Sequence, residues 1–480
     1  MKRSKFSLSN YKLLSLDMGE LVPIGVMEVL PGDTIQHSTS ALVRASPLLA
    51  PVMHPVHVHI RHFFVPYRLL WVGFEDFITG GPDGLNVAAV PQFDSDKAGI
   101  HANGSLGDYL GLPTTFNGNQ RLSAFPFRAY NMIWNEYYRD QDLQSELLNL
   151  NTGGLDITSN TTLQRVNWEK DYFTSARPWE QKGVSIQVPV WTNSQNVQMR
   201  YGVTPTVDRS LIANATQDSL RLDAVTANNP SVRFGTQTGL QVSTQLLREA
   251  FAIQRYEEAR ARFGSRYTEY LRYLGVRSSD ARLQRPEYLG GGSQTIQFSE
   301  VLQTAEGSDP VGDLKGHGIA AMRSNRYRRF FEEHGIVLSL MSVRPKSIYM
   351  QGVQRLWRKA VREEYWQREL QHIGQQEVYN QEISANHNAP NGVFGYQDRY
   401  DEYRRIPSTV AGEFRTSTLD YWHMARDLGA NPALNSAFVT CNPTERTFAV
   451  PSQDVIYVMA HHSIQARRLV AQSGSRSFVF

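Results

Sequence analysis

A strict alternation of apolar and polar side chains in residues 55–66 constrains this chain more than any other feature. Val56, Val58 and Ile60 recur at every second position, and His or Arg residues stand between and after them. A period of two residues is typical of a β-strand with one buried face. The segment therefore predicts a core strand, and the fold must contain at least one half-buried sheet.

Other segments repeat this period or the helical one. Strands are expected over residues 183–189, 294–301, 336–343 and 455–464, and a hairpin-like pair over 26–44 around a turn at 31–33. Helices are expected over 124–143, 244–262 and 267–274, where apolar residues recur at helical spacing. This order lacks the regular alternation of a doubly wound α/β enzyme. It predicts a mainly β fold, an antiparallel barrel with long excursions.

One domain spanning residues 1–480 is expected, with three excursions from its core. Residues 74–182 hold loops and the first expected helix, and residues 244–275 are expected to be helical. Residues 191–243 are rich in Asn, Thr, Gln, Ser and Asp. Such a polar stretch cannot bury a large core of its own, so it predicts a surface insertion.

Charge and cysteine content exclude several classes of protein. The 49 Lys and Arg residues against 46 Asp and Glu leave a net charge of +3, so contact with nucleic acid depends on local patches. Cys441 is the only cysteine, which excludes a disulfide within the chain and fits a reducing cytoplasm. No window approaches about 18 uninterrupted apolar residues, so no membrane insertion is expected.

Motifs for catalysis or cofactor binding are missing from the sequence. There is no Walker-type phosphate loop, no zinc-protease spacing and no Gly-x-Ser-x-Gly elbow. A carbohydrate-cleaving enzyme would need paired acids, and the candidates Asp94, Asp96, Asp140 and Asp142 lie in expected loops or on a helix surface. We therefore expect no catalytic residue and no cofactor.

Four histidines form the one constellation that could suggest a metal site. They are His54, His57, His59 and His62, of which His57 and His59 would project from the same strand face. No carboxylate lies near them in the sequence, and His is common on polar strand faces. We favour a structural role over a metal site. The pair His461 and His462 should point to opposite faces of a strand.

Two basic patches are candidates for contact with nucleic acid. One stands near the N-terminus. In the other, Arg323, Arg326, Arg328 and Arg329 are interleaved with Tyr327 and Phe330, a composition suited to stacking bases as well as pairing phosphates. A solvated loop or a contact between subunits would explain the same residues, and the sequence alone favours that interpretation. The candidate contact residues are Lys2, Arg3, Lys5, Arg326, Arg328 and Arg329.

Eight segments resemble, in the same order, segments of a known protein family. The longest are AFPFRAYNMIWNEYYRDQDL at 124–143 and NGVFGYQDRYDEYRR at 391–405, and ARLQRPEYLGG at 281–291 is unusual in composition. The others are VLPGDT at 29–34, FFVPYRLLW at 63–71, DYFTSARPWEQKG at 171–183, EHGIVLSL at 333–340 and LDYWHMA at 419–425. Together they are similar to the major capsid proteins of the Microviridae, most closely those of gokushovirus-type phages.

The resemblance implies a structural protein of the virion, made in the bacterial cytoplasm. It implies an eight-stranded antiparallel jelly roll with long insertions, and a T=1 icosahedral shell of about 60 copies around circular single-stranded DNA. It further implies that residues 191–243 build a protrusion at the threefold axes. The implied partners are a small DNA-packaging peptide, an internal scaffolding protein and a host surface receptor. The alternative is a cytoplasmic single-stranded DNA-binding protein, which would need a strongly basic face.

Overall fold

The computed structural model divides the chain into two compact units, Met1–Glu180 with Arg262–Phe480, and Gln181–Ala261. The expected strand at 183–189 and most of the polar stretch at 191–243 fall outside the described residues. The structure describes residues 3–82, 85–97, 100–183, 199–200, 208–209, 211–214, 219–222, 244–263, 266–277, 279–302 and 314–471.

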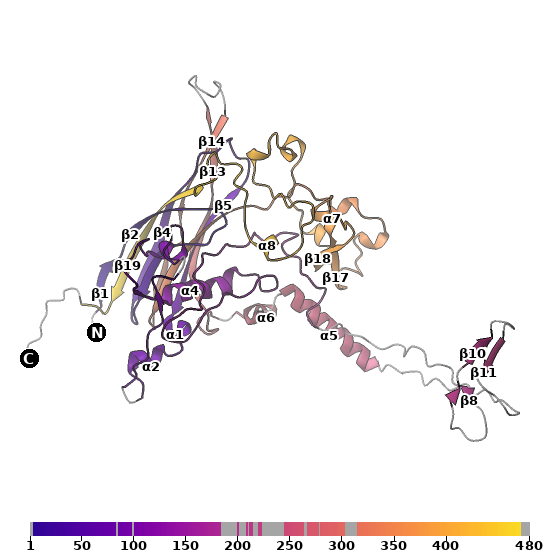
Figure 1. Cartoon of the computed structure of the whole chain (residues 1–480), viewed down its shortest axis with the longest axis horizontal. Coiled ribbons are helices and arrows are strands. Elements are labelled where there is room, and N and C mark those ends of the chain that lie inside the picture. Colours follow the sequence, from indigo (N-terminus) through magenta and orange to yellow (C-terminus); the bar gives the residue numbers. More distant parts are fainter. Residues whose placement is uncertain are drawn as a thin grey trace, which may run out of the picture. The chain divides into compact units, whose positions relative to one another are not determined.

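Two antiparallel sheets form the larger unit, as Figure 1 shows. The four-stranded sheet has the order β12 (Glu287–Thr295), β5 (Val56–Pro66), β16 (Gly335–Pro345), β3 (Val22–Val29). The seven-stranded sheet has the order β1 (Ser4–Ser7), β19 (Ile456–Arg468), β4 (Thr34–Ala45), β14 (Leu314–Arg323), β13 (Gln297–Leu302). In addition, β2 (Asn10–Leu16) pairs with β19, and β15 (Tyr327–Phe330) pairs with β4. The predicted mainly β, antiparallel architecture is confirmed.

An apolar core cluster lies between the two sheets. It joins Val58 of β5 and Met341 of β16 in one sheet to Val43 of β4 and Val458 of β19 in the other. The predicted strand at 55–66 is confirmed as β5, and the apolar residues of its alternating face are fully buried. Strand β16 is buried on both faces, because its other side packs beneath α4 (Phe125–Ile133).

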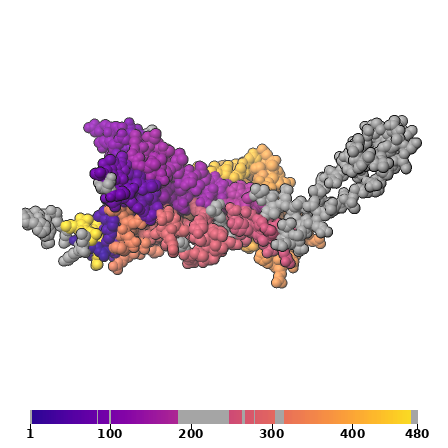
Figure 2. All heavy atoms as spheres, turned by 90° about the horizontal axis from the view of Figure 1, so that it is seen from below, coloured from indigo at the N-terminus to yellow at the C-terminus, as the bar shows by residue number. Residues whose placement is uncertain are grey.

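The two ends of the described chain lie side by side in the seven-stranded sheet. Lys5 stands opposite Arg467 across the ladder from β1 to β19, and Tyr11 stands opposite His461 across that from β2 to β19. Indigo and yellow segments therefore adjoin in both views (Figures 1 and 2). Strands β1 and β2 were not predicted, because polar residues interrupt their apolar alternation.

Three sequence predictions need correction. The pair at 26–44 is no hairpin, because β3 and β4 lie in different sheets, and the turn with Gly32 at φ 86° carries the chain between them. The strand expected at 294–301 is two strands, which separate at buried Ile296 where the chain changes sheet. The helix expected at 124–143 ends earlier, in a π-helical turn at Trp134–Tyr138, because Arg139 is extended.

Several other predictions are confirmed. Strand β19 places His461 half-exposed and His462 buried, so these two rings do point to opposite faces. The helices α5 (Thr244–Phe263) and α6 (Tyr267–Tyr273) occupy the expected ranges, and Cys441 is a buried free thiol. The shorter helices are α1 (Tyr67–Leu70), α2 (Phe74–Thr79), α3 (Leu106–Leu110), α7 (Asn380–Ile383) and α8 (Ser436–Val439). No described helix combines the length and apolar character needed to cross a membrane.

Small strand pairs complete the two units. The larger unit also contains β6 (Gln92–Asp94) with β7 (Arg121–Ser123), and β17 (Gln375–Tyr379) with β18 (Val393–Asp398). The smaller unit contains β8 (Met199–Arg200) with β9 (Asp208–Arg209), and β10 (Leu211–Asn214) with β11 (Ser219–Leu222).

Three buried histidines cross the space between the sheets. His462 Nε2 donates to the carbonyl of Ile24 at 2.9 Å, which leaves its Nδ1 to accept from Thr39 Oγ1 at 2.9 Å. His37 joins this group through Nε2, 3.2 Å from Nδ1 of His462. A Cβ at Gly25 would lie 2.7 Å from the His462 ring, so this glycine gives the ring its room.

The other contacts satisfy the network with neutral rings. Tyr327 donates its hydroxyl to His37 Nδ1 at 3.1 Å, and His62 lies 2.8 Å from Ser339 Oγ and 3.1 Å from Ser324 Oγ. Burial, with the neighbouring His62 and His462, lowers the pKa of His37 to about 2. Burial and His462 lower the pKa of His62 to about 3. Among the described residues, no carboxylate is hydrogen-bonded to these three rings, so a proton taken up by the network has no counter-charge there.

We predict that acid destabilises the sheet packing through these rings. In the unfolded chain His titrates near pH 6.5, so below that pH the unfolded state binds protons that the folded state refuses, and stability is lost as pH falls. His37 and His62 together should remove roughly 3 kcal/mol of unfolding free energy per pH unit between about pH 6 and pH 4. Urea unfolding across this range measures the slope.

The double variant His37→Gln/His62→Gln should flatten this dependence, while His57→Gln on the half-exposed face of β5 should leave it unchanged. Equal slopes for the double variant and the original chain would contradict the assignment.

Candidate nucleic-acid interface

The seven-stranded sheet presents one face to the core and the other outward. Along β19, residues from Ile456 to Ala466 alternate between buried and at least partly exposed positions. Residues directly opposite each other in an antiparallel ladder share a face. The registers of β1, β2, β4, β14 and β15 therefore identify the outward side chains.

Six exposed cations lie on this outward face, which we call the basic sheet face. One row of directly opposed residues crosses four adjacent strands: Lys5 of β1, Arg467 of β19, Thr34 of β4 and Phe330 of β15. Arg3 donates to Thr34 Oγ1 at 3.0 Å, and its guanidinium lies 5.3 Å from the Phe330 ring centre. The six cations are Arg3, Lys5, Arg44, Arg323, Arg328 and Arg467.

No acidic residue balances these charges on the sheet itself. None of the outward positions in the paired registers is Asp or Glu. Within the described parts of the chain, none of the six cations forms a salt bridge. By contrast, Arg468 of the same sheet is paired, with its Nε 3.0 Å from Asp33 Oδ2.

The structure brings together only part of the set predicted from the sequence. Arg3, Lys5 and Arg328 share the basic sheet face, and Lys2 lies outside the described residues. Arg326 is exposed in the turn before β15. Arg329 belongs to the other face of β15, where its Nη2 lies 2.9 Å from Glu287 Oε1.

Two members of the basic sheet face escaped the sequence predictions: Arg44 and Arg467. Arg44 lies on β4 and Arg467 lies on β19, and the ladder between these strands joins residues more than 400 positions apart. No local pattern in the sequence predicts a pairing between strands so far apart. The only usable signal was the β19 alternation, which places Arg467 on the same side as Tyr457 and Met459.

The histidines considered for a metal are distributed among different contacts. His57 and His59 share the polar face of β5, with ring centres 6.3 Å apart. His54 Nε2 donates to the carbonyl of Lys346 at 2.8 Å, and His62 lies in the buried network. Among the described residues, no group of three or more His, Cys, Asp or Glu is arranged to hold a metal ion.

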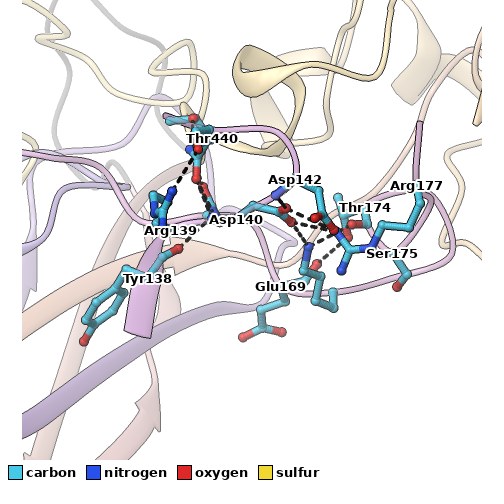
Figure 3. Close-up of polar contacts among 12 residues, drawn as sticks. Tyr138, Arg139, Asp140, Asp142, Glu169, Thr174, Ser175, Arg177 and Thr440 are labelled. Atoms are coloured by element: carbon cyan, nitrogen blue, oxygen red, sulfur yellow. Dashed lines mark hydrogen bonds and ion pairs between the residues drawn. The ribbon is translucent and has the colours of Figure 1, made fainter. Parts of the chain in front are cut away.

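A cavity of about 340 Å³ contains two of the acids considered for catalysis. Arg177 Nη1 lies 3.1 Å from Asp140 Oδ1 and 3.2 Å from Asp142 Oδ2 (Figure 3). Lys170 also forms an ion pair with Asp140. Burial would raise the pKa of Asp140, but Lys170 and Arg177 outweigh it and hold that pKa below its usual value. An acid that stays ionised cannot serve as the proton donor of a glycosidase.

The rest of this cavity is also an ion-pair network. Glu169 lies 3.5 Å from Arg344 of β16 and 3.6 Å from His59 of β5. Asp94, the other acid with a partner, lies 3.1 Å from Arg121 across the β6–β7 pair. The Glu169 ion pairs tie the segment after α4 to the core strands β5 and β16, and all these carboxylates have a structural use.

Comparison with known proteins decides the family. Residues 1–475 match the family model described as capsid protein (F protein). The chain belongs to this capsid protein family. The capsid protein is 34% identical to capsid protein VP1 of Chlamydia phage 1, over 94% of this chain and 92% of that protein. It is 32% identical to VP1 of Bdellovibrio phage phiMH2K and 31% identical to VP1 of Spiroplasma virus 4, each over 94% of this chain and 90% of the relative.

The expected function is confirmed at this level. The protein is a structural major capsid protein of a phage, it resides in the virion, and it is not an enzyme. Self-assembly follows from that role, and its residues of interest are those on surfaces.

We predict that the Asp140 ion pairs stabilise the capsid protein. Asp140→Asn removes the shared partner of Arg177 and Lys170 while the Asp140 side chain is only 3% exposed. Because Lys170 is half-exposed, the loss of unfolding free energy should be about 2 kcal/mol, below the range for a fully buried pair. Urea denaturation measures it.

Asp94→Asn is the matched control, since its partner Arg121 is 53% exposed. It should cost under about 1 kcal/mol. Equal losses of unfolding free energy in the two variants would show that the Asp140 ion pairs stabilise the protein no more than an exposed pair does.

Proposed function

We propose that the capsid protein assembles as a T=1 icosahedral shell of about 60 copies around a circular single-stranded DNA genome. The observation that carries this proposal is the family match over residues 1–475. One chain in a T=1 shell makes two-, three- and fivefold contacts with the same sequence. Exposed aromatic and Arg side chains suit such contacts, and Trp357, Tyr365 and Trp366 are each more than half exposed.

The chain path supports an eight-stranded jelly roll as the core of this shell protein. A jelly roll is a double sheet whose consecutive strands cross from one sheet to the other. Here β3, β4 and β5 alternate between sheets, as do β12 and β13 and later β15 and β16. Strands β14 and β15 pair with successive parts of β4 and so occupy one strand position. The additional strands of the larger sheet, β1 and β2, pair with β19.

The insertions are proposed to lie outside the shell core. Residues 74–182 and 244–275 would be excursions of loops and helices, and residues 191–243 would build the protrusion at the threefold axes. In support, Gln181–Ala261 form a compact unit of their own. Such a unit can be lost without removing side chains from the core between the sheets.

The further partners proposed are the packaged DNA, a small DNA-packaging peptide, an internal scaffolding protein and a host surface receptor, with assembly in the bacterial cytoplasm. Lys2, Arg3, Lys5, Arg326 and Arg328 would face the genome. Arg329, expected with them from the sequence, instead lies beside Glu287 on the opposite face of β15. The basic sheet face also suits the alternative, a free single-stranded DNA-binding protein. Membership of the capsid family favours the shell.

Electron microscopy and native mass measurement of the purified assembly test the proposal. Uniform spheres with the mass of about 60 chains and nuclease-sensitive circular single-stranded DNA are expected. Filaments, small open oligomers or a double-stranded genome would contradict it.

We predict that replacing residues 191–243 by a short Gly/Ser linker leaves the capsid protein folded. The melting temperature should change by less than about 4 °C, the shift expected for a loss of 1 kcal/mol in a domain of moderate size. Circular dichroism and thermal melting measure this, while particle yield and infectivity should fall. An unfolded deletion variant would show that the stretch belongs to the core.

A further inference from the structure

We propose that the basic sheet face is the surface of the capsid protein that contacts the packaged DNA. Its cations would pair with phosphates, and the exposed rings beside them would stack on bases. This inference rests on the proposed single-stranded DNA genome and adds the surface that receives it.

Repulsion between the cations of this face costs free energy of folding, and a bound counter-charge would reduce that cost. Lys5 and Arg467 stand directly opposite each other in adjacent strands, and like charges in that position destabilise a sheet. Arg3 lies at the same corner of the sheet, where it contacts Thr34 and the Phe330 ring, and Arg328 lies two residues from Phe330 on β15. With no outward acid on the strands, a polyanion laid across the face would relieve this repulsion.

Exposed aromatic rings accompany the cations on the same face. Tyr11 is 69% exposed and stacks on His461 with ring centres 4.3 Å apart. Phe330 lies below the Arg3 guanidinium, and Tyr457 stands opposite Arg44. Cations that follow a backbone, combined with rings on which bases stack, are the composition of surfaces that bind single strands without sequence preference.

A second copy of this chain fits the face poorly. A twofold contact through it would press the same cations against each other, which costs free energy. A flexible single strand can adapt its phosphates to cations fixed on five strands. An acidic protein segment would match DNA only in its negative charge, because it lacks bases that could stack on the exposed rings.

Neighbouring residues of β15 supply a matched comparison. Arg328 lies on the basic sheet face, whereas Arg329 lies on the opposite face beside Glu287. A test variant combines Arg323→Gln, Arg328→Gln and Arg467→Gln. A control variant with the same loss of charge combines Arg329→Gln with changes at two exposed arginines outside the sheets, Arg282→Gln and Arg368→Gln.

Binding of an oligothymidine strand to the full-length unassembled capsid protein gives the first measurement. The test variant should bind about tenfold more weakly at 0.1 M salt, and its salt slope should fall by about 2, from three lost phosphate contacts. The control variant should change less than twofold. Equal weakening of both variants, or no weakening of either, would overturn the proposal.

Crosslinking in wild-type particles gives a second measurement that needs no variant to fold. Irradiation of particles with bromouracil-substituted DNA should attach the genome to peptides with Tyr11, Phe330 or Tyr457. Crosslinks confined to other surfaces would overturn the proposal. A test variant that binds the strand normally but forms no particles would identify a subunit contact instead.

These outcomes separate the inference from the function on which it rests. Wild-type particles that contain no single-stranded DNA would refute the proposed genome itself. Particles of the test variant that retain the genome as well as wild type would refute only the role of this face.

Discussion

The structure depends on the burial of one apolar face from each of two antiparallel sheets. Val43 and Val458 from the larger sheet meet Val58 and Met341 from the smaller one in an apolar core cluster. Burial of such side chains supplies the main favourable free energy of folding. Because side chains alternate along a strand, the same burial also determines which residues must point outward. Fold and surface are therefore consequences of one packing arrangement.

The outward residues of the larger sheet show how function uses this arrangement. The ladders hold cations side by side although their mutual repulsion opposes folding, and the core between the sheets outweighs that repulsion. Burial between the sheets lowers the pKa of His37, His62 and His462, so acid opposes the packed state through these rings. Both features make stability sensitive to solution conditions, the outer one to salt and the inner one to pH.

Sequence reasoning succeeded where the physics is local. The alternation at residues 55–66 predicted β5 and its buried face, and helical spacing predicted α5 and α6. It failed where partners are distant in the sequence, as for the assignment of β3 and β4 to different sheets. For the same reason it grouped Arg329 with Arg328 and missed Arg44 and Arg467. A run of cations does not show which of them share a face until the ladders are known.

The most direct test of this account is a map of the assembled particle at side-chain resolution. The outward face of β4, β14, β15 and β19 should line the interior, with density for nucleotides beside Arg328 and Arg467 and against the ring of Phe330. A basic sheet face on the outer surface of the particle, or one buried against a neighbouring subunit, would contradict it.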